Sequence, residues 1–304
     1  MKTAAAPRIT FYRHKVLLAL LQAFGGRLSN IDLQKYLFLF TEQCQRDKSY
    51  EFVPYRYGCF SFQSYADRSK LAELGAISAD LERWELAPRA NYLAMLTDSD
   101  REKMKRFQDK YAGLSGDALV REMYARYPYY AIRSEIAGRL MSKAQLAAIE
   151  AERPKQKRAC FFTIGYEGKS FEYYLNQLIR NNVRVLCDVR KNPLSRKYGF
   201  SKRVLSATLE SLDILYIHMP ELGIVSEKRQ SLATVTDYQR LFDDYEATTL
   251  RDSGEALQRL AEVVKQHKRV AITCFEAEEC MCHRGRVAKA LQQLPDWKYP
   301  IKHL

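Results

Sequence analysis

The sequence predicts the α/β class: a mainly helical N-terminal domain followed by a domain with a mostly parallel sheet and helices on both faces. A chain of 304 residues is too long for one small core and suits two domains. At Pro154 an Ala-rich helical stretch gives way to a basic connector and then to a strand-like run. Beyond it, short apolar runs alternate with segments of helical length, the pattern of a parallel sheet covered on both faces. We therefore expect domains at 1–153 and 154–304.

Three helices are expected at the start of the N-terminal domain. The first ends at Gly25-Gly26, the second is capped by Ser29 or Asn30, and the third ends at Gly75. The alternating run 81–88 could form the strand of a wing, and residues 101–150 read as helical with a break at Pro128. This succession is typical of a winged helix, but many small helical domains share it.

The C-terminal domain reads as strands and helices in alternation. The expected strands are 161–166, 183–190, 214–219 and 269–276. The expected helices are 170–182, 201–212, 237–250, 253–267 and 285–294, with Ser170 and Ser201 as caps of the first two. Ligands of such sheets bind outside the carboxyl ends of the strands.

Charge and cysteine content bear on partner and location. Residues 151–203 hold 13 Lys and Arg against 4 acidic residues, most of the net charge of +13. Such a cluster favours a nucleic-acid partner, and we favour DNA over RNA. Seven scattered cysteines suggest reduced thiols, and neither a signal peptide nor a long apolar window is evident, so we expect a cytoplasmic protein without a membrane partner.

The predicted strand ends gather the candidate site residues. The acids Glu167, Asp188 and Glu276 follow three different strands and are the candidate catalytic groups. The candidate substrate- and phosphate-binding residues are Tyr166, Lys169, Arg190, Ser195, Arg196, Lys197, Tyr198, Phe200, His218, His283, Arg284 and Arg286.

Four ordered motifs in this half resemble a known family. "TIGYEG", "DVRKNPLSRKYGFSKRVL", "YIHMPELG" and "CFEAEECMCHRGRVAKAL" are similar to DUF488, a bacterial and archaeal domain of unknown function. The resemblance implies a Rossmann-like sheet and a shared site, but no settled reaction. The residues that carry over are Glu167, Asp188, Arg190, Pro193, Ser195, His218, Leu222, Gly223, Cys274, Glu276, Cys282, His283 and Arg284.

Two stretches of the N-terminal half also resemble a family. "LQKYLFLF" and "YEFVPYRYGCFS" look like the SocA/Panacea antitoxin-associated domain, with its Leu-Gln-Lys helix and a following Tyr-Gly turn. The resemblance covers about fifty residues. It implies an accessory domain or one that binds a protein partner.

The loop 274–286 allows three interpretations. Cys280, Cys282 and His283 could hold zinc, but they crowd into one turn with no second pair of ligands nearby. The spacing Cys280-x5-Arg286 fits a phosphatase-type loop, although that signature normally begins directly at the strand end, and here the strand ends at Cys274. We favour a loop that grips an anion through Arg284, Arg286 and a helix N-terminus, and expect neither a metal nor a cofactor.

These residues favour hydrolysis of a nucleic acid. Asp188 beside Arg190 should stay ionised and suits orientation, so Glu167 or Glu276 is the better group to activate water. We favour N-glycosidic base excision, as by a DNA glycosylase, with Tyr166, Tyr198 and Phe200 available to stack an extruded base, ordinary or modified. A metal-dependent nuclease remains an alternative, as does a ligand-sensing regulator without enzymatic activity. No Walker loop or Gly-x-Gly-x-x-Gly stretch supports a common nucleotide cofactor.

Overall fold

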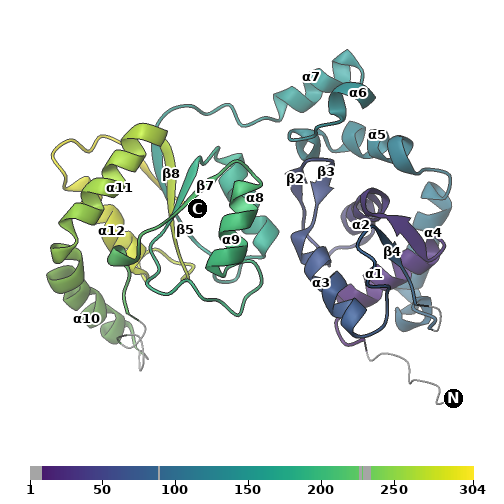
Figure 1. The fold of residues 1–304 in the computed structure, drawn as a ribbon, viewed down its shortest axis with the longest axis horizontal. Helices are drawn as coiled ribbons and strands as arrows, with labels where there is room; N and C mark the ends of the chain where they lie inside the picture. Colours follow the sequence, from purple (N-terminus) through teal and green to yellow (C-terminus); the bar gives the residue numbers. More distant parts are fainter. Residues whose placement is uncertain (1–8, 88–89, 226–227, 229–233) are drawn as a thin grey trace. The chain divides into compact units, whose positions relative to one another are not determined.

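The chain folds into two compact units, Met1–Arg153 and Pro154–Leu304, and each is described by itself. The computed structural model describes residues 9–87, 90–225, 228 and 234–304 (Figure 1). Within those residues no helix is long and apolar enough to cross a membrane.

The N-terminal unit is mainly helical, as the sequence predicts. Its helices are α1 (Tyr12–Ala23), α2 (Asn30–Cys44), α3 (Phe62–Glu73), α4 (Asp98–Tyr111), α5 (Gly116–Arg126), α6 (Ala137–Leu140) and α7 (Lys143–Ala151), with the 3-10 turns η1 (Leu93–Met95) and η2 (Pro128–Ala131). Two antiparallel ribbons accompany them: β1 (Arg27–Ser29) pairs with β4 (Arg83–Glu85), and β2 (Val53–Tyr55) pairs with β3 (Gly58–Phe60).

Local signals explain where these elements begin and end. Gly25 and Gly26 follow α1 with φ of 88° and 77°, a backbone region that favours glycine. The Ser29 hydroxyl accepts the Asp32 N–H at 3.0 Å and caps α2. The predicted wing strand is β4, although Pro88 of that prediction lies outside the described residues. The hairpin β2–β3 was not predicted, because its two strands are only three residues long.

A buried polar cluster around Asp67 of α3 stabilises the N-terminal unit. Its carboxylate accepts from Arg13 Nε at 2.6 Å and from the Tyr50 hydroxyl at 2.9 Å, and His14 Nε2 lies 3.2 Å away. Burial opposes ionisation, but the contacts from His14 and Arg13 outweigh it and lower the pKa of Asp67 to about 2 from 3.8.

The Asp67 cluster should make the stability of this unit depend on acid pH. A carboxylate whose pKa is lower in the folded state stabilises the fold above its unfolded pKa, so about 2 kcal/mol should be lost as pH falls from about 4 to about 2. Denaturant titrations across that range should show the loss in the natural protein and not in Asp67→Asn. Asp98→Asn, at an exposed position of α4, should follow the natural protein. An unchanged pH profile in Asp67→Asn would contradict this assignment.

The C-terminal unit is built on one five-stranded parallel sheet in the order β7-β6-β8-β5-β9. The strands are β5 (Cys160–Gly165), β6 (Val185–Asp188), β7 (Leu215–His218), β8 (Arg269–Cys274) and β9 (Ile301–His303). The helices are α8 (Phe171–Arg180), α9 (Lys202–Glu210), α10 (Val235–Tyr245), α11 (Gly254–His267) and α12 (His283–Gln292), with a 3-10 turn η3 (Pro220–Leu222) and a π-helical turn η5 (Glu246–Leu250).

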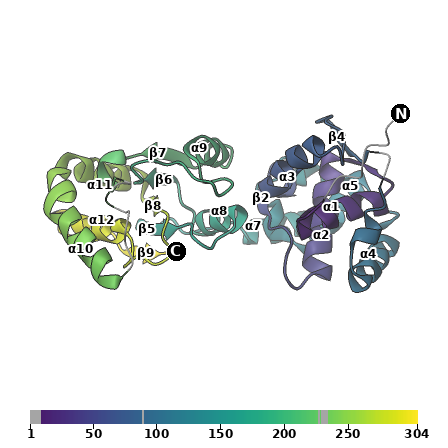
Figure 2. The same ribbon diagram turned by 90° about the horizontal axis from the view of Figure 1, so that it is seen from below.

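Helices cover both faces of this sheet. Figures 1 and 2 show α8 and α9 on one face and α10, α11 and α12 on the other. On the second face, Phe161, Val185 and Ile272 pack against residues of those three helices, including Leu260 and Val287. The predicted fold class, a mostly parallel sheet with helices on both faces behind a helical N-terminal region, is confirmed.

Candidate functional site

Three strands end at the same edge of the sheet and bring the predicted loops together. Gly165 ends β5, Asp188 ends β6 and Cys274 ends β8, and all three strands are parallel. The N–H groups of Tyr166 and Glu167 both donate to the carbonyl of Phe275, at 3.1 and 2.8 Å. The loop after β5 is therefore fixed directly to the loop after β8.

Gly165 is required for this close approach. A Cβ at residue 165 would lie 1.7 Å from the carbonyl oxygen of Glu276. We expect Gly165→Ala to displace the loop after β8 and to lower the free energy of unfolding by about 1–3 kcal/mol, as overpacking does. Gly254→Ala is the matched control, because a Cβ at Gly254 meets nothing within 4 Å. Denaturant unfolding of both variants checks this, and equal stabilities would contradict it.

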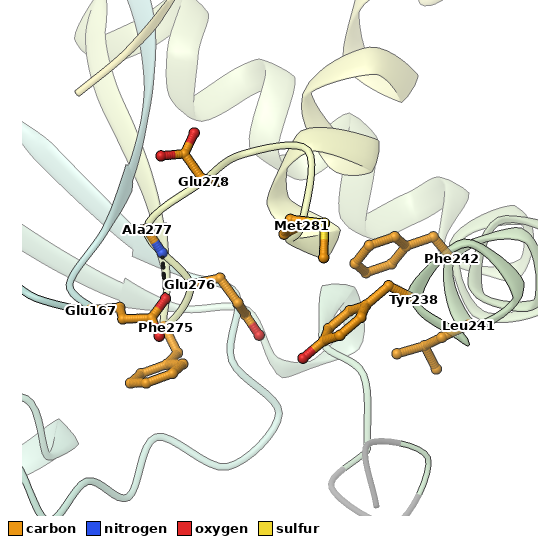
Figure 3. Close-up of a pocket in the computed structure, with 9 residues that line it drawn as sticks. All are labelled: Glu167, Tyr238, Leu241, Phe242, Phe275, Glu276, Ala277, Glu278 and Met281. Carbon is orange, nitrogen blue, oxygen red and sulfur yellow. Dashed lines mark hydrogen bonds between the residues drawn. The ribbon is translucent and has the colours of Figure 1, made fainter. Parts of the chain in front are cut away.

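A pocket with acidic and aromatic walls opens beside these loops. It has a volume of about 410 Å³ and joins the loop after β8 to α10. We call it the acidic pocket, and Figure 3 shows the side chains of Glu276 and Tyr238 pointing toward each other across it. The Glu167 carboxylate lies at its edge and accepts the Ala277 N–H at 3.0 Å. Its lining residues are Glu167, Tyr238, Leu241, Phe242, Phe275, Glu276, Ala277, Glu278 and Met281.

A second pocket, which we call the basic pocket, shares Phe275 with the first. It has a volume of about 320 Å³ and is lined largely by the loop after β6. Its cationic residues are Arg190, Lys191 and Arg196. Its other lining residues are Tyr166, Asn192, Leu194, Ser195, Ile224, Cys274, Phe275 and His283. Phe275 is 43% exposed and separates a cationic pocket from an acidic one.

Asp188 and Arg190 form a buried ion pair beneath the basic pocket. Asp188 is fully buried and accepts Arg190 Nε at 2.8 Å and Nη2 at 2.6 Å. The Tyr216 hydroxyl also donates to Asp188, at 2.7 Å. Burial opposes the charge on Arg190, but the contacts with Asp188 outweigh it and raise the pKa of Arg190 above its ordinary value. In this structure Asp188 positions Arg190 and does not line either pocket, whereas the sequence placed it among the candidate catalytic groups.

Two of the three predicted stacking aromatics, Tyr166 and Phe200, pack inside the unit and do not form an open platform. Tyr166 and Phe200 stack with ring centroids 4.2 Å apart, and both are buried. Tyr198 meets Phe171 edge to face at 5.8 Å. The aromatic ring exposed between the pockets is Phe275, which sequence reasoning did not select because it reads as part of a strand.

Several predicted phosphate-binding residues contact the main chain. Lys169 Nζ donates to the carbonyl of Gly165 at 2.9 Å, and Lys197 Nζ donates to that of Tyr166 at 2.9 Å. Burial lowers the pKa of Lys169, and the charge of Arg284 adds to that effect. His218 Nε2 lies 3.0 Å from the carbonyl oxygen of Arg190. These three side chains hold the loops, whereas Arg196 and Ser195 line the basic pocket.

Arg284 and Arg286 do not form the predicted anion grip. Arg284 is buried and donates to the main-chain carbonyls of Glu276 and Ala277, the second at 2.7 Å. Arg286 pairs with Glu246 at 3.0 Å, on the α10 side of the sheet. The guanidinium group of Arg284 contacts main-chain carbonyls, and that of Arg286 contacts a carboxylate. Arg284 therefore links the loop after β8 to α12.

The same loop brings four potential metal ligands together. One atom each from Cys274, Glu276, Cys282 and His283 lies within 4.8 Å of all the others. Cys274, Cys282 and His283 are buried, whereas Cys280 is exposed and lies outside the group. Burial, followed by the neighbouring Cys274 and Glu276, raises the pKa of the Cys282 thiol well above its ordinary value. As possible zinc ligands the sequence suggested Cys280, Cys282 and His283, and it did not include Cys274, which it placed at a strand end and among the residues shared with DUF488.

One family model matches part of this unit. No curated protein matches the chain. The model of one family matches a stretch that begins at the cap of α8 and ends within α12, and this stretch includes Asp188, Glu276 and Cys282. Over residues 170–291 the chain matches the family described as a domain of unknown function, DUF488, which confirms the resemblance over that stretch.

Proposed function

We propose that the C-terminal unit is a nucleic-acid-directed hydrolase that cleaves N-glycosidic bonds. One observation carries this proposal: an acidic pocket with aromatic walls and a cationic pocket meet at the exposed ring of Phe275. Base excision needs a pocket whose aromatic or apolar side chains stack on the extruded base, a carboxylate near the sugar and cations near the flanking phosphates. The two pockets supply these three parts side by side.

Glu167 is the group that we assign to the reacting water. Its carboxylate is at the edge of the acidic pocket, and the hydrogen bond from Ala277 N–H at 3.0 Å fixes its orientation. A carboxylate in this place can accept a proton from water as the water oxygen bonds to the sugar carbon and the bond from that carbon to the base breaks, and the departing base takes up a proton from solvent. Glu276 lies on the other wall, where Cys274 Sγ is 3.2 Å from its Oε2.

The basic pocket and the basic stretch of sequence support a polyanionic substrate. Lys191 and Arg196 line the basic pocket, and both belong to the stretch 151–203 with its 13 basic residues. Phosphates held there would place the next nucleotide at Phe275, whose ring can stack on a base. We propose DNA as the nucleic acid, with ordinary or modified bases as substrates.

The geometry gives less support to the two alternatives. A Mg²⁺-dependent nuclease would use oxygen ligands, but within the described residues the group of close potential ligands contains two thiols and neither Glu167 nor Asp188. A ligand-sensing regulator would bind nucleic acid without turnover, and the assay below separates it from an enzyme. For the N-terminal unit we propose an accessory role, in line with its resemblance to SocA/Panacea domains, in which it binds DNA or a protein partner.

Labelled single- and double-stranded DNA with ordinary and modified bases tests the proposal. The full-length protein is incubated with each substrate with and without EDTA, and strands are resolved before and after alkali. We expect breaks that appear only after alkali and that resist EDTA. Direct breaks abolished by EDTA would indicate a metal-dependent nuclease instead, and salt-sensitive binding without breaks would indicate a regulator.

A further inference from the structure

The loop after β8 brings two thiols, a carboxylate and an imidazole close together. Cys274 is the last residue of β8, Glu276 follows it by two, and Cys282 and His283 stand at the start of α12. Two pairs of ligands thus face each other across the ends of one loop. This arrangement supplies the second pair that a zinc site needs.

Three distances between these ligand atoms lie near those of a tetrahedral site, and all four atoms lie within 4.8 Å of one another. Zn²⁺ bonds of about 2.0–2.3 Å place tetrahedral ligand atoms roughly 3.3–3.8 Å apart. Cys274 Sγ is 3.2 Å from Glu276 Oε2 and 3.5 Å from His283 Nδ1, and Cys282 Sγ is 4.0 Å from the same nitrogen. Small side-chain movements would therefore bring all four atoms to one ion.

The second ring nitrogen of His283 supports the same conclusion. His283 Nε2 lies 3.1 Å from the carbonyl oxygen of Val189, so the N–H belongs on Nε2 and the lone pair on Nδ1 points at the two thiols. Histidines that bind metals are oriented in this way, by donating their other N–H to a carbonyl or carboxylate. Both thiols and the imidazole are buried, which excludes competing water.

Charge also favours an ion at this place. Two thiolates, one carboxylate and a neutral imidazole around Zn²⁺ carry a net charge of −1. The N-terminus of α12 and the buried guanidinium of Arg284, which donates to the loop carbonyls, are favourable surroundings for that charge. Two thiols and an imidazole suit zinc, whereas Mg²⁺ and Ca²⁺ prefer oxygen ligands.

We propose that Cys274, Glu276, Cys282 and His283 bind one Zn²⁺ ion, which fixes the loop after β8. The two thiol protons leave for solvent when the ion binds. The loop that carries these ligands contributes Phe275, Ala277, Glu278 and Met281 to the acidic pocket, so the ion would hold one wall of that pocket in place. The inference does not depend on the proposed base excision.

Metal analysis of tag-free, full-length protein tests this site. We expect about one zinc per chain after expression with added zinc, and replacement by Co²⁺ should give the thiolate charge-transfer absorption of a tetrahedral site. Cys282→Ser and Cys274→Ser should lose the metal. Cys280→Ser is the matched control, because Cys280 is an exposed cysteine of the same loop outside the cluster, and it should keep the metal.

A conservative variant distinguishes the loss of a zinc ligand from misfolding of the protein. Glu276→Gln keeps the size of the side chain, and in a chelator competition it should weaken zinc binding by at least about tenfold, since even outer-shell changes cost 10–100-fold. Its circular dichroism should match that of the natural protein. Natural protein that takes up no zinc, or equal loss of zinc in Cys280→Ser and Cys282→Ser, would overturn the assignment. Protein that binds zinc but releases no base would support this zinc site and contradict the proposed function.

Discussion

Replacing Glu167 with glutamine should reduce base release by about 10²- to 10⁴-fold, the usual contribution of a positioned general base. The amide oxygen of glutamine can still accept the Ala277 N–H, so the loop contact seen at 3.0 Å should persist. What the variant loses is the ability to take a proton from water. Single-turnover rates on the best DNA substrate measure the effect.

Glu278 provides the matched control for this experiment. It lines the same acidic pocket as a second exposed carboxylate, so Glu278→Gln removes one negative charge from the same pocket. We expect its rate to stay within a few-fold of the natural protein, with binding unchanged in both variants. If both variants lost the same fraction of the rate, Glu167 would act only through its negative charge. If Glu167→Gln kept the natural rate, Glu167 would not be the base.

Replacing Asp188 with alanine should lower the free energy of unfolding of the C-terminal unit by about 3–5 kcal/mol. The substitution leaves the Arg190 guanidinium, 6% exposed, without the carboxylate that accepts its Nε and Nη2. Denaturant unfolding followed by hydrogen exchange and peptide mass spectrometry assigns the loss to this unit. The double variant with Arg190→Met should lose less than Asp188→Ala alone, because no buried charge remains.

An exposed ion pair of the same unit supplies the control. Arg251 and Asp252 are 2.9 Å apart, with side chains 70% and 66% exposed, so Asp252→Ala should change stability by no more than about 0.5 kcal/mol. If Asp188→Ala were as mild as Asp252→Ala, the pair would not support the loop after β6. A double variant less stable than Asp188→Ala would contradict the charge argument.

The sheet could be predicted from sequence where burial leaves a continuous apolar run. β5 and β8 are six residues long and buried almost throughout, so their composition alone identifies them. β9 was not predicted, because Ile301–His303 contains only one apolar residue and two of its three residues are exposed. Its strand character comes from pairing with β5, which depends on the rest of the fold.

The sequence predicted which loops carry the candidate site residues, but not the contacts that each side chain makes. The order of strands and loops predicted that Glu167, Glu276, Ser195 and Arg196 follow strand ends, and in the structure these residues line the two pockets. Sequence could not show that Arg284 would turn inward to main-chain carbonyls, since a guanidinium near a helix start binds an anion or a carbonyl equally well.

The thiol cluster shows a different limit of sequence reasoning. In the sequence, Cys280, Cys282 and His283 crowd into one turn, and no second pair of ligands is evident nearby. The loop instead turns so that Cys274 and Glu276 meet Cys282 and His283, while Cys280 faces solvent. The pattern Cys-x-Glu followed after five residues by Cys-His was the available signal, and only the fold shows that its two halves meet.

Direct detection of the released base is the sharpest test of the proposed base excision. A DNA oligonucleotide is incubated with the full-length protein in oxygen-18-labelled water, and the products are weighed by mass spectrometry. We expect equal amounts of free base and of an abasic strand that carries the heavy oxygen at the sugar, with both products lost in Glu167→Gln. An intact strand with every base retained, or cleaved strands in which no base is missing, would contradict it.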